Sequence, residues 1–271
     1  MTRFQTVFAC AAAIAALSGP AVAELPDSIV QAQVLSGWRM ESGEHMAAIR
    51  LELAPGWKTY WRSPGDAGIP PEFDWSGSDN LASYQPHWPV PKVSYLNGVR
   101  SVGYADVVVV PIRFTPQRAG EAIDLTGQMH IGVCESVCVP MTLNIAASLP
   151  ASTGQGGNDT IRRALADRPL TQTEAGVSNV VCRIEPISDG LRVAIDVEMP
   201  AMGNGEEAVV EFADRSVWVA EPQAERTGGT LTVITEMVPQ EAAPFAMARS
   251  DVRVTVFGNG AAVDIQGCSG S

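Results

Sequence analysis

The chain has 271 residues, of which 46% are hydrophobic and 18% charged, and its formal net charge is −12. An acidic chain repels phosphate backbones, and no basic stripe offsets this charge, so nucleic acid is excluded as an expected partner. The length is sufficient for two small domains, each with its own core.

The first 23 residues have the features of a secretory signal peptide. Arg3 precedes an apolar stretch at 7–17, and the small-residue site Ala21-Val22-Ala23 follows a Gly-Pro break. The apolar stretch is too short to cross a bilayer, and no later run approaches the roughly 20 residues that a span needs. We therefore expect a protein that is exported from the cytoplasm and does not span the membrane. Loss of Arg3 would change the net charge from −12 to −13.

Residues 24–150 alternate β-like stretches with turn signals. Apolar residues recur with period 2 in the first of these stretches, and a long loop rich in Pro, Gly, Asp and Ser occupies 63–80. Many short strands with Gly/Pro turns predict a β-sandwich domain. The expected strands lie at 45–53, 57–61, 104–114, 123–133 and 139–149.

Residues 151–171 have the composition of a linker, with one short helix expected at 160–167. Strand signals then resume, and we expect a second, smaller β-sandwich over 172–271. Its strands are predicted at 180–184, 191–197, 208–212, 216–219, 230–234 and 252–257. The predicted fold class is thus all-β, with two sandwich domains joined by a linker that contains one helix.

Cys134 and Cys138 are the most informative residues of the chain. A continuous strand would hold their α-carbons roughly 13 Å apart, whereas a disulfide needs about 4.4–6.8 Å. A bonded pair therefore requires a turn at 135–137, and the sulfurs would lie at an exposed hairpin where exchange is easy. The spacing alone leaves three interpretations open: a structural staple, redox exchange and metal binding.

The metal interpretation rests on soft ligands close to the cysteine pair. Met129, His130, Cys134 and Cys138, with Met141 beyond them, are of the kind that Cu(I) prefers. Met and His beside a strand are more often packing or surface residues. No nucleophile elbow, phosphate loop or zinc-protease motif occurs in the sequence.

Cys182 and Cys268 lie near the two ends of the second predicted domain. An even number of cysteines in an exported chain suggests disulfides. A bond between these two would close a loop of roughly 87 residues, worth about 4–5 kcal/mol in the chain-entropy model. We interpret the pair as a structural staple, and a second redox centre is the alternative.

Four segments in the same order resemble the N-terminal periplasmic domain of the thiol:disulfide interchange protein DsbD, and more closely its ScsB-like branch, named for suppression of copper sensitivity. They cover most of residues 24–150. The segments are Gly56-Trp57-Lys58-Thr59-Tyr60-Trp61, Trp88-Pro89-Val90-Pro91, Tyr104-Ala105-Asp106 with the strand that follows it, and Cys134 to Pro140. DsbD itself has a longer spacing between its two cysteines.

The resemblance implies an immunoglobulin-like sandwich that acts as a thiol-disulfide oxidoreductase without an organic cofactor. Cys134 and Cys138 would exchange electrons, and the segment 94–98 would be a mobile cap with Tyr95 or Leu96 as its lid. The residues expected to line the site are Tyr60, Trp61 and Tyr104.

The partners that the resemblance implies are a membrane-embedded electron donor and periplasmic thioredoxin-like proteins. The sequence contains neither the family's membrane domain nor its thioredoxin domain, so we expect the donor on a separate chain. The alternative function is a copper-binding or non-catalytic interaction module on the same scaffold, with a role in copper tolerance.

Overall fold

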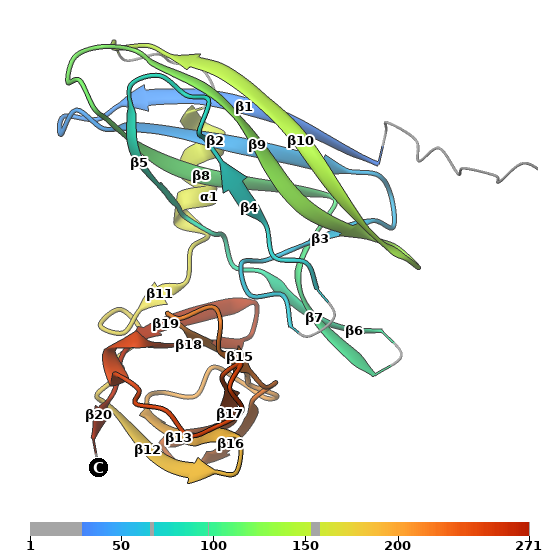
Figure 1. The fold of residues 1–271 in the computed structure, drawn as a ribbon, viewed down its shortest axis with the longest axis vertical. Coiled ribbons are helices and arrows are strands. Elements are labelled where there is room, and N and C mark those ends of the chain that lie inside the picture. The colour runs from blue at the N-terminus through green and yellow to red at the C-terminus, as the bar shows by residue number, and fades with distance from the viewer. Residues whose placement is uncertain (1–28, 66–67, 97, 153–157, 271) are drawn as a thin grey trace, which may run out of the picture.

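The computed structural model describes residues 29–65, 68–96, 98–152 and 158–270. The predicted signal peptide, 1–23, lies outside these residues. Within them the chain is almost entirely β-structure, with a single α-helix, which confirms the predicted fold class (Figure 1). The strands form four sheets, of which two are built from β1–β10 and two from β11–β20.

We call strands β1–β10 the N-terminal unit. One of its sheets has the order β1-β2-β8-β5, and the other has the order β10-β9-β3-β7-β6 with β4 paired to β9. Its strands are β1 (Val30–Arg39), β2 (His45–Leu53), β3 (Lys58–Tyr60), β4 (Glu72–Asp74), β5 (Leu81–Pro86), β6 (Lys92–Leu96), β7 (Val99–Ala105), β8 (Val107–Pro116), β9 (Ile123–Cys134) and β10 (Cys138–Leu149).

We call strands β11–β20 the C-terminal unit, and helix α1 (Asn158–Ala166) precedes it. One sheet has the order β11-β19-β18-β14, and the other has the order β15-β17-β13-β12-β20 with β16 paired to β17. The strands are β11 (Leu170–Thr171), β12 (Asn179–Ile187), β13 (Gly190–Glu198), β14 (Glu207–Phe212), β15 (Trp218–Val219), β16 (Gln223–Thr227), β17 (Thr230–Val238), β18 (Val252–Gly258), β19 (Ala261–Gln266) and β20 (Ser269–Gly270), with a 3-10 turn at Arg249–Asp251.

The predicted strand at 104–114 is in fact two strands. Asp106 adopts a positive φ of 60° and separates β7 from β8. Beyond the break the valine run alternates, with Val107 46% exposed while Val108 and Val110 are buried. The run therefore has one face in the core of the N-terminal unit, as expected for an antiparallel sandwich strand.

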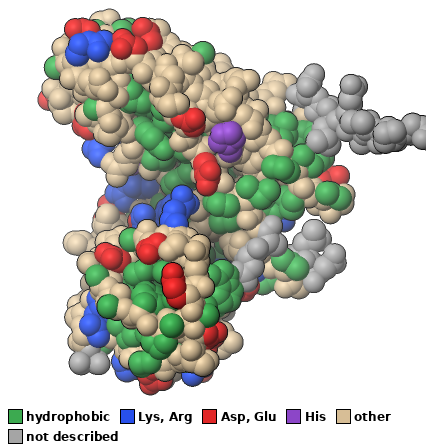
Figure 2. All heavy atoms as spheres, viewed as in Figure 1, with side chains coloured by type: hydrophobic (Ala, Val, Ile, Leu, Met, Phe, Trp, Pro, Cys, Tyr) green, Lys and Arg blue, Asp and Glu red, His purple; other side chains and the backbone are tan. Residues whose placement is uncertain are grey.

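The two units share a packed interface. Val209, Phe257 and Ala262 of the C-terminal unit belong to the apolar cluster that forms the core of the N-terminal unit. Basic side chains gather in the hollow between the units (Figure 2), where a cavity of about 470 Å³ is lined by three arginines, Arg62, Arg168 and Arg253, among other residues. Each of these arginines is paired with a carboxylate of the C-terminal unit.

Candidate functional site

The cysteine pair closes the hairpin between β9 and β10. Cys134 is the last residue of β9, Cys138 is the first of β10, and the two are partners in the antiparallel register. Their sulfurs are bonded, and their α-carbons lie 4.2 Å apart. The chain thus turns at 135–137, as the spacing predicted. An α-carbon separation of about 4.5 Å is usual for a pair without backbone hydrogen bonds in such a ladder, so the strands themselves bring the two cysteines together.

The two cysteines differ in their access to solvent. Cys134 is buried, with 1% of its surface exposed, whereas Cys138 is an exposed residue. Val137, between them in the turn, is 68% exposed. A partner that approaches this hairpin therefore reaches Cys138 before Cys134.

Tyr60 on β3 contacts both sulfurs. Its hydroxyl lies 2.8 Å from Cys134 Sγ and 3.1 Å from Cys138 Sγ, and it is the donor because a disulfide has no proton to give. Burial raises the pKa of Tyr60 above its ordinary value, which keeps the hydroxyl protonated. The ring fits between two glycines, since a Cβ at Gly132 or at Gly68 would lie 3.0 Å from a ring carbon.

Neighbouring residues of β3 fix the strand beside the cysteines. Thr59 Oγ1 donates to the carbonyl oxygen of Gly132 at 2.9 Å. Lys58 is the register partner of Cys134, and its ammonium donates to Ser101 Oγ at 2.9 Å. Lys58, Thr59 and Gly132 are not among the site residues predicted from the sequence, although the first two lie within the motif that carries the family resemblance.

Trp61 and Tyr104 were predicted to line the site, and the structure places them behind it. Trp61 follows Tyr60, is completely buried, and packs edge-on against Phe257 with ring centroids 5.6 Å apart. The Tyr104 hydroxyl donates to the carbonyl oxygen of Pro89 at 2.8 Å, and burial raises its pKa well above its ordinary value.

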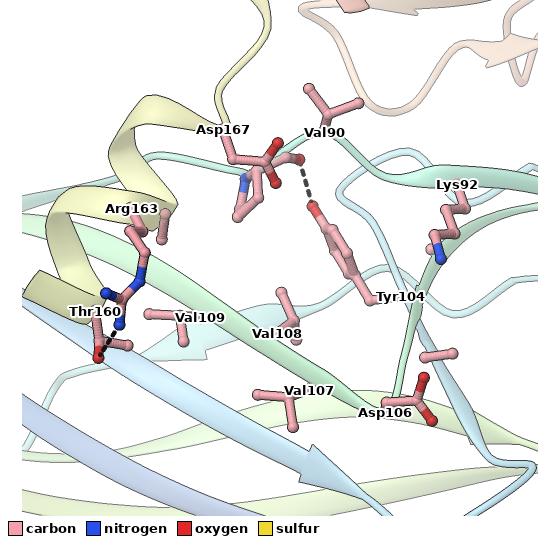
Figure 3. Close-up of a pocket in the computed structure, with 14 residues that line it drawn as sticks. Val90, Lys92, Tyr104, Asp106, Val107, Val108, Val109, Thr160, Arg163 and Asp167 are labelled. Atoms are coloured by element: carbon pink, nitrogen blue, oxygen red, sulfur yellow. Dashed lines mark hydrogen bonds between the residues drawn. The ribbon is translucent and has the colours of Figure 1, made fainter. Parts of the chain in front are cut away.

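Tyr104 lies between two cavities. A small one of about 110 Å³ also touches Tyr60 and Lys58. A larger one of about 560 Å³ lies between α1 and the start of β8 and is lined by Arg163, Asp167 and the valine run. Figure 3 shows that Asp167 lies close to Val90 and Tyr104, whereas Arg163 extends toward Thr160. Tyr104 and Tyr60 thus line the same small cavity, and of the two only Tyr60 has a hydrogen bond to the sulfurs.

The predicted cap lies on the hairpin of β6 and β7. In the sheet order, β6 is three positions away from β9, which carries Cys134. The Tyr95 hydroxyl donates to the carboxylate of Glu207 in the C-terminal unit, at 2.7 and 2.9 Å from its two oxygens. Leu96 ends β6 and is the register partner of Val99. Tyr95 is thus engaged by the C-terminal unit in this structure, and its role as a lid remains a prediction.

Cys182 and Cys268 form the second disulfide, with α-carbons 5.7 Å apart. Cys182 lies on β12 and is completely buried. Cys268 precedes β20, which pairs with β12 in parallel, and Ser269 Oγ donates to the carbonyl oxygen of Val180. This bond therefore ties the end of the chain to the sheet, in the position expected of a staple.

Met129 and His130, the two residues considered as Cu(I) ligands beside the cysteine pair, lie on opposite faces of β9. Met129 is buried in the core, whereas His130 is exposed and shares a hydrogen bond of 3.0 Å with Thr142. Adjacent strand residues point to opposite faces, and four residues of strand separate His130 from Cys134 by roughly 13 Å. Within the described ranges, no three His, Cys, Asp or Glu side chains form a group that could hold a metal ion.

The fold and the site define a two-unit β-sandwich protein that presents a disulfide at an accessible hairpin. Residues 27–149 match the model of the family described as thiol:disulfide interchange protein DsbD, N-terminal. This match confirms the resemblance predicted from the sequence for this domain.

The structure is also similar to the crystal structure of the N-terminal periplasmic domain of ScsB from Proteus mirabilis. The TM-score is 0.67 at 20% sequence identity, over 92% of this chain and 96% of that chain. At this identity the likeness establishes the fold of both units and nothing more. No curated protein matched the sequence. In the part of the chain that the structure describes, no helix has the length and apolarity needed to cross a membrane.

Proposed function

We propose that this protein is a periplasmic thiol:disulfide interchange module that carries electrons through Cys134 and Cys138. The observation that carries the proposal is the hairpin disulfide itself, which joins one exposed and one buried cysteine and has the Tyr60 hydroxyl in contact with both sulfurs. The family match over 27–149 supports it. Exposed disulfides of this kind are the exchangeable ones.

The exchange begins when the thiolate of a reduced partner attacks Cys138 Sγ, because Cys138 is the exposed residue of the pair. The new bond joins the partner's sulfur to Cys138, and the Cys134–Cys138 bond breaks. Cys134 leaves as a thiolate, which accepts the hydrogen bond of the Tyr60 hydroxyl 2.8 Å away. A second thiol of the partner then attacks its own sulfur in the mixed disulfide and releases Cys138. Two electrons have then moved to the pair, and the partner has become a disulfide.

The reduced pair passes the same two electrons to an oxidised acceptor by the reverse steps. The family resemblance makes a membrane-embedded protein the donor and periplasmic thioredoxin-like proteins the acceptors. Both would be separate chains. No organic cofactor takes part in this chemistry, since thiolates and disulfides supply all the electrons.

Mass mapping after mild reduction of the full chain tests the assignment of the pairs. A graded glutathione buffer should open the exposed pair first, so that alkylation appears at Cys134 and Cys138 while Cys182 and Cys268 stay bonded. Equal reactivity of all four cysteines would contradict the proposal.

A trapping experiment tests the direction of attack. Cys134→Ser leaves the exposed Cys138 thiol without its internal partner. We expect it to form a stable mixed disulfide with a thioredoxin-like protein that lacks its resolving cysteine and carries thionitrobenzoate on its remaining cysteine. The Cys138 thiolate attacks that cysteine sulfur, and thionitrobenzoate leaves as the free thiolate. Cys138→Ser is the matched control, and its buried thiol should be captured far more slowly. If neither variant is captured and the reduced wild type binds Cu(I) tightly, the copper-binding function replaces this one.

A further inference from the structure

Three consecutive residues, Tyr60, Trp61 and Arg62, connect the cysteine pair to the C-terminal unit. Tyr60 contacts the sulfurs, and Trp61 packs on Phe257. The Arg62 guanidinium lies 4.0 Å from the Trp61 ring centroid and donates from Nε and Nη2 to the Glu211 carboxylate, at 3.0 and 2.8 Å. We propose that the C-terminal unit is a positioning device, which holds Tyr60 on the sulfurs through these contacts and so sets the reduction potential of the pair.

The C-terminal unit presents one face of a sheet to this segment. Alternate residues of β14 point toward the N-terminal unit: Glu207 and Glu211 bind arginines, and Val209 between them enters the apolar core. Phe257 on β18 lies beside them as the register partner of Glu207. Val209 and Phe257 are only 4% and 6% exposed, so both side chains are buried where the two units meet. A shift of this sheet is therefore transmitted to Trp61 and Arg62.

The other side of the Tyr60 ring is also covered by residues close to the C-terminal unit. A Cβ at Gly68 would meet both Pro64 and the Tyr60 ring. Pro64 and Gly68 line a groove of about 370 Å³ together with Phe212 and Trp218 of the C-terminal unit. The phenol thus lies between β9 and a loop that borders the C-terminal unit.

The position of this hydroxyl affects the two redox states unequally. A thiolate accepts a hydrogen bond more strongly than a neutral disulfide sulfur does, because the bond is charge-assisted. The Tyr60 hydroxyl therefore stabilises the reduced pair more than the oxidised pair and raises the reduction potential. Any loss of its alignment should lower the potential and make the disulfide harder to reduce.

The inference rests on the proposed function, and a glutathione redox titration of the full chain tests it. Removal of the hydroxyl in Tyr60→Phe should lower the equilibrium constant for reduction about tenfold, which is about 30 mV for a two-electron couple. Glu211→Gln weakens the contact to Arg62 and should shift the constant in the same direction by about threefold. Phe257→Leu keeps most of the buried volume but removes the ring that packs against Trp61, and it should also lower the equilibrium constant for reduction.

Glu207→Gln is the matched control. It removes a carboxylate charge from the same strand and the same interface, but Glu207 binds Tyr95 and Arg100 on the β6–β7 hairpin and does not touch residues 60–62. The equilibrium constant for reduction of the cysteine pair in Glu207→Gln should equal that of the wild type. A shift as large as that of Glu211→Gln would show general loosening of the interface and would overturn the inference.

The decisive measurement is the double variant of Tyr60→Phe with Glu211→Gln. If the C-terminal unit acts through the phenol, the double variant should have the potential of Tyr60→Phe alone. Additive shifts, or no shift in both Glu211→Gln and Phe257→Leu, would overturn the inference. Failure of the wild-type pair to exchange with any thiol would instead remove the proposed function.

Discussion

Gly132 lies two residues before Cys134 on β9, and the Tyr60 ring packs over it. A Cβ at this position would be 2.7 Å from Ile69 Cβ and 3.0 Å from Tyr60 Cδ2. Tyr60 cannot move away easily, since it is buried against the sulfurs. The absence of a side chain at 132 is therefore what allows the phenol to reach the disulfide.

Gly132→Ala should displace Tyr60 or the strand and destabilise the protein by about 1–3 kcal/mol, the usual cost of overpacking. Urea unfolding measures this as a lower midpoint at an unchanged slope. Gly229→Ala is the matched control, because a Cβ there has no atom within 4 Å, and its effect should stay within about 0.5 kcal/mol. Equal urea midpoints for Gly132→Ala and Gly229→Ala would show that a side chain at position 132 fits beside Tyr60 after all.

For single residues, the sequence predicted correctly what the covalent geometry of a disulfide requires. The spacing of Cys134 and Cys138 required a turn, and the turn is present. The sequence could not assign Trp61, because two adjacent strand residues face opposite ways and only the pairing of β3 shows which one meets the sulfurs. The role of Gly132 was hidden for a similar reason, since its neighbour Tyr60 is 72 positions away in the chain.

The hairpin of β6 and β7 is the element with two separate attachments. Its base belongs to the sheet that carries the cysteines, and its outer part is bound to the C-terminal unit through Tyr95 and Arg100. Arg100 is 5% exposed and also donates to the carbonyl oxygen of Ala208 at 2.7 Å. The cap hypothesis requires the outer part to leave Glu207 and to cover the sulfurs in some fraction of molecules.

Replacement of both Tyr95 and Leu96 by Ala should then increase the rate at which a small thiol reduces the cysteine pair, because the lid is removed. Glu207→Gln should decrease that rate, because it releases the hairpin. Neither variant should change the equilibrium potential, since a lid slows both directions of exchange equally. Stopped-flow reduction by dithiothreitol gives the rates. Unchanged rates in both variants would reject the lid.

Strands were predicted correctly where apolar and polar residues alternate over a long segment. The predicted strand 45–53 coincides with β2, and those at 123–133 and 139–149 agree with β9 and β10 to within one residue. Short edge strands escaped prediction, as β6 shows with its polar sequence Lys-Val-Ser-Tyr-Leu. Such strands are specified by their neighbours in the sheet more than by their own propensity.

His45 connects local packing with the stability of the whole molecule. It is completely buried at the start of β2, and its Nε2 lies 2.5 Å from the carbonyl oxygen of Ser36. Burial lowers the pKa of His45 below the ordinary value of 6.5. The native protein therefore binds fewer protons at this site than the unfolded chain does in mildly acidic solution.

The free energy of unfolding should consequently fall as the pH decreases from about 6.5 to 5, by at most about 1.4 kcal/mol per pH unit for one histidine. Above pH 6.5 this contribution is fully present, because the imidazole is neutral in both states. In His45→Gln, thermal unfolding at a series of pH values should show a flatter slope. Burial also lowers the pKa of His87, so part of the dependence of stability on pH should remain in this variant.

The exposed His130 supplies the matched control, and His130→Gln should keep the wild-type slope. Identical slopes for His45→Gln and the wild type would contradict the assignment to His45. At pH values below 5 the carboxylates begin to titrate, so the comparison belongs above that range.

On the scale of the whole molecule, composition and turn signals were enough to predict two β-sandwiches. Their interface was beyond prediction from one sequence. Arg62 and Glu211 are 149 positions apart, and each alone has the pattern of a solvated surface charge. The same holds for Arg100 and Glu207, which only the folded chain brings together.

The register of the β9–β10 hairpin bears on how often the molecule can be used. The ladder already holds the α-carbons of Cys134 and Cys138 at 4.2 Å, so opening their bond releases no segment of backbone. Opening the bond of Cys268 would instead free a terminal strand. In the proposed exchange, the Cys134–Cys138 bond would thus be broken and remade between two paired strands, while the Cys182–Cys268 bond stays closed. The proposed exchange would therefore need no local unfolding of the β9–β10 hairpin, a state in which a chain is open to aggregation and proteolysis.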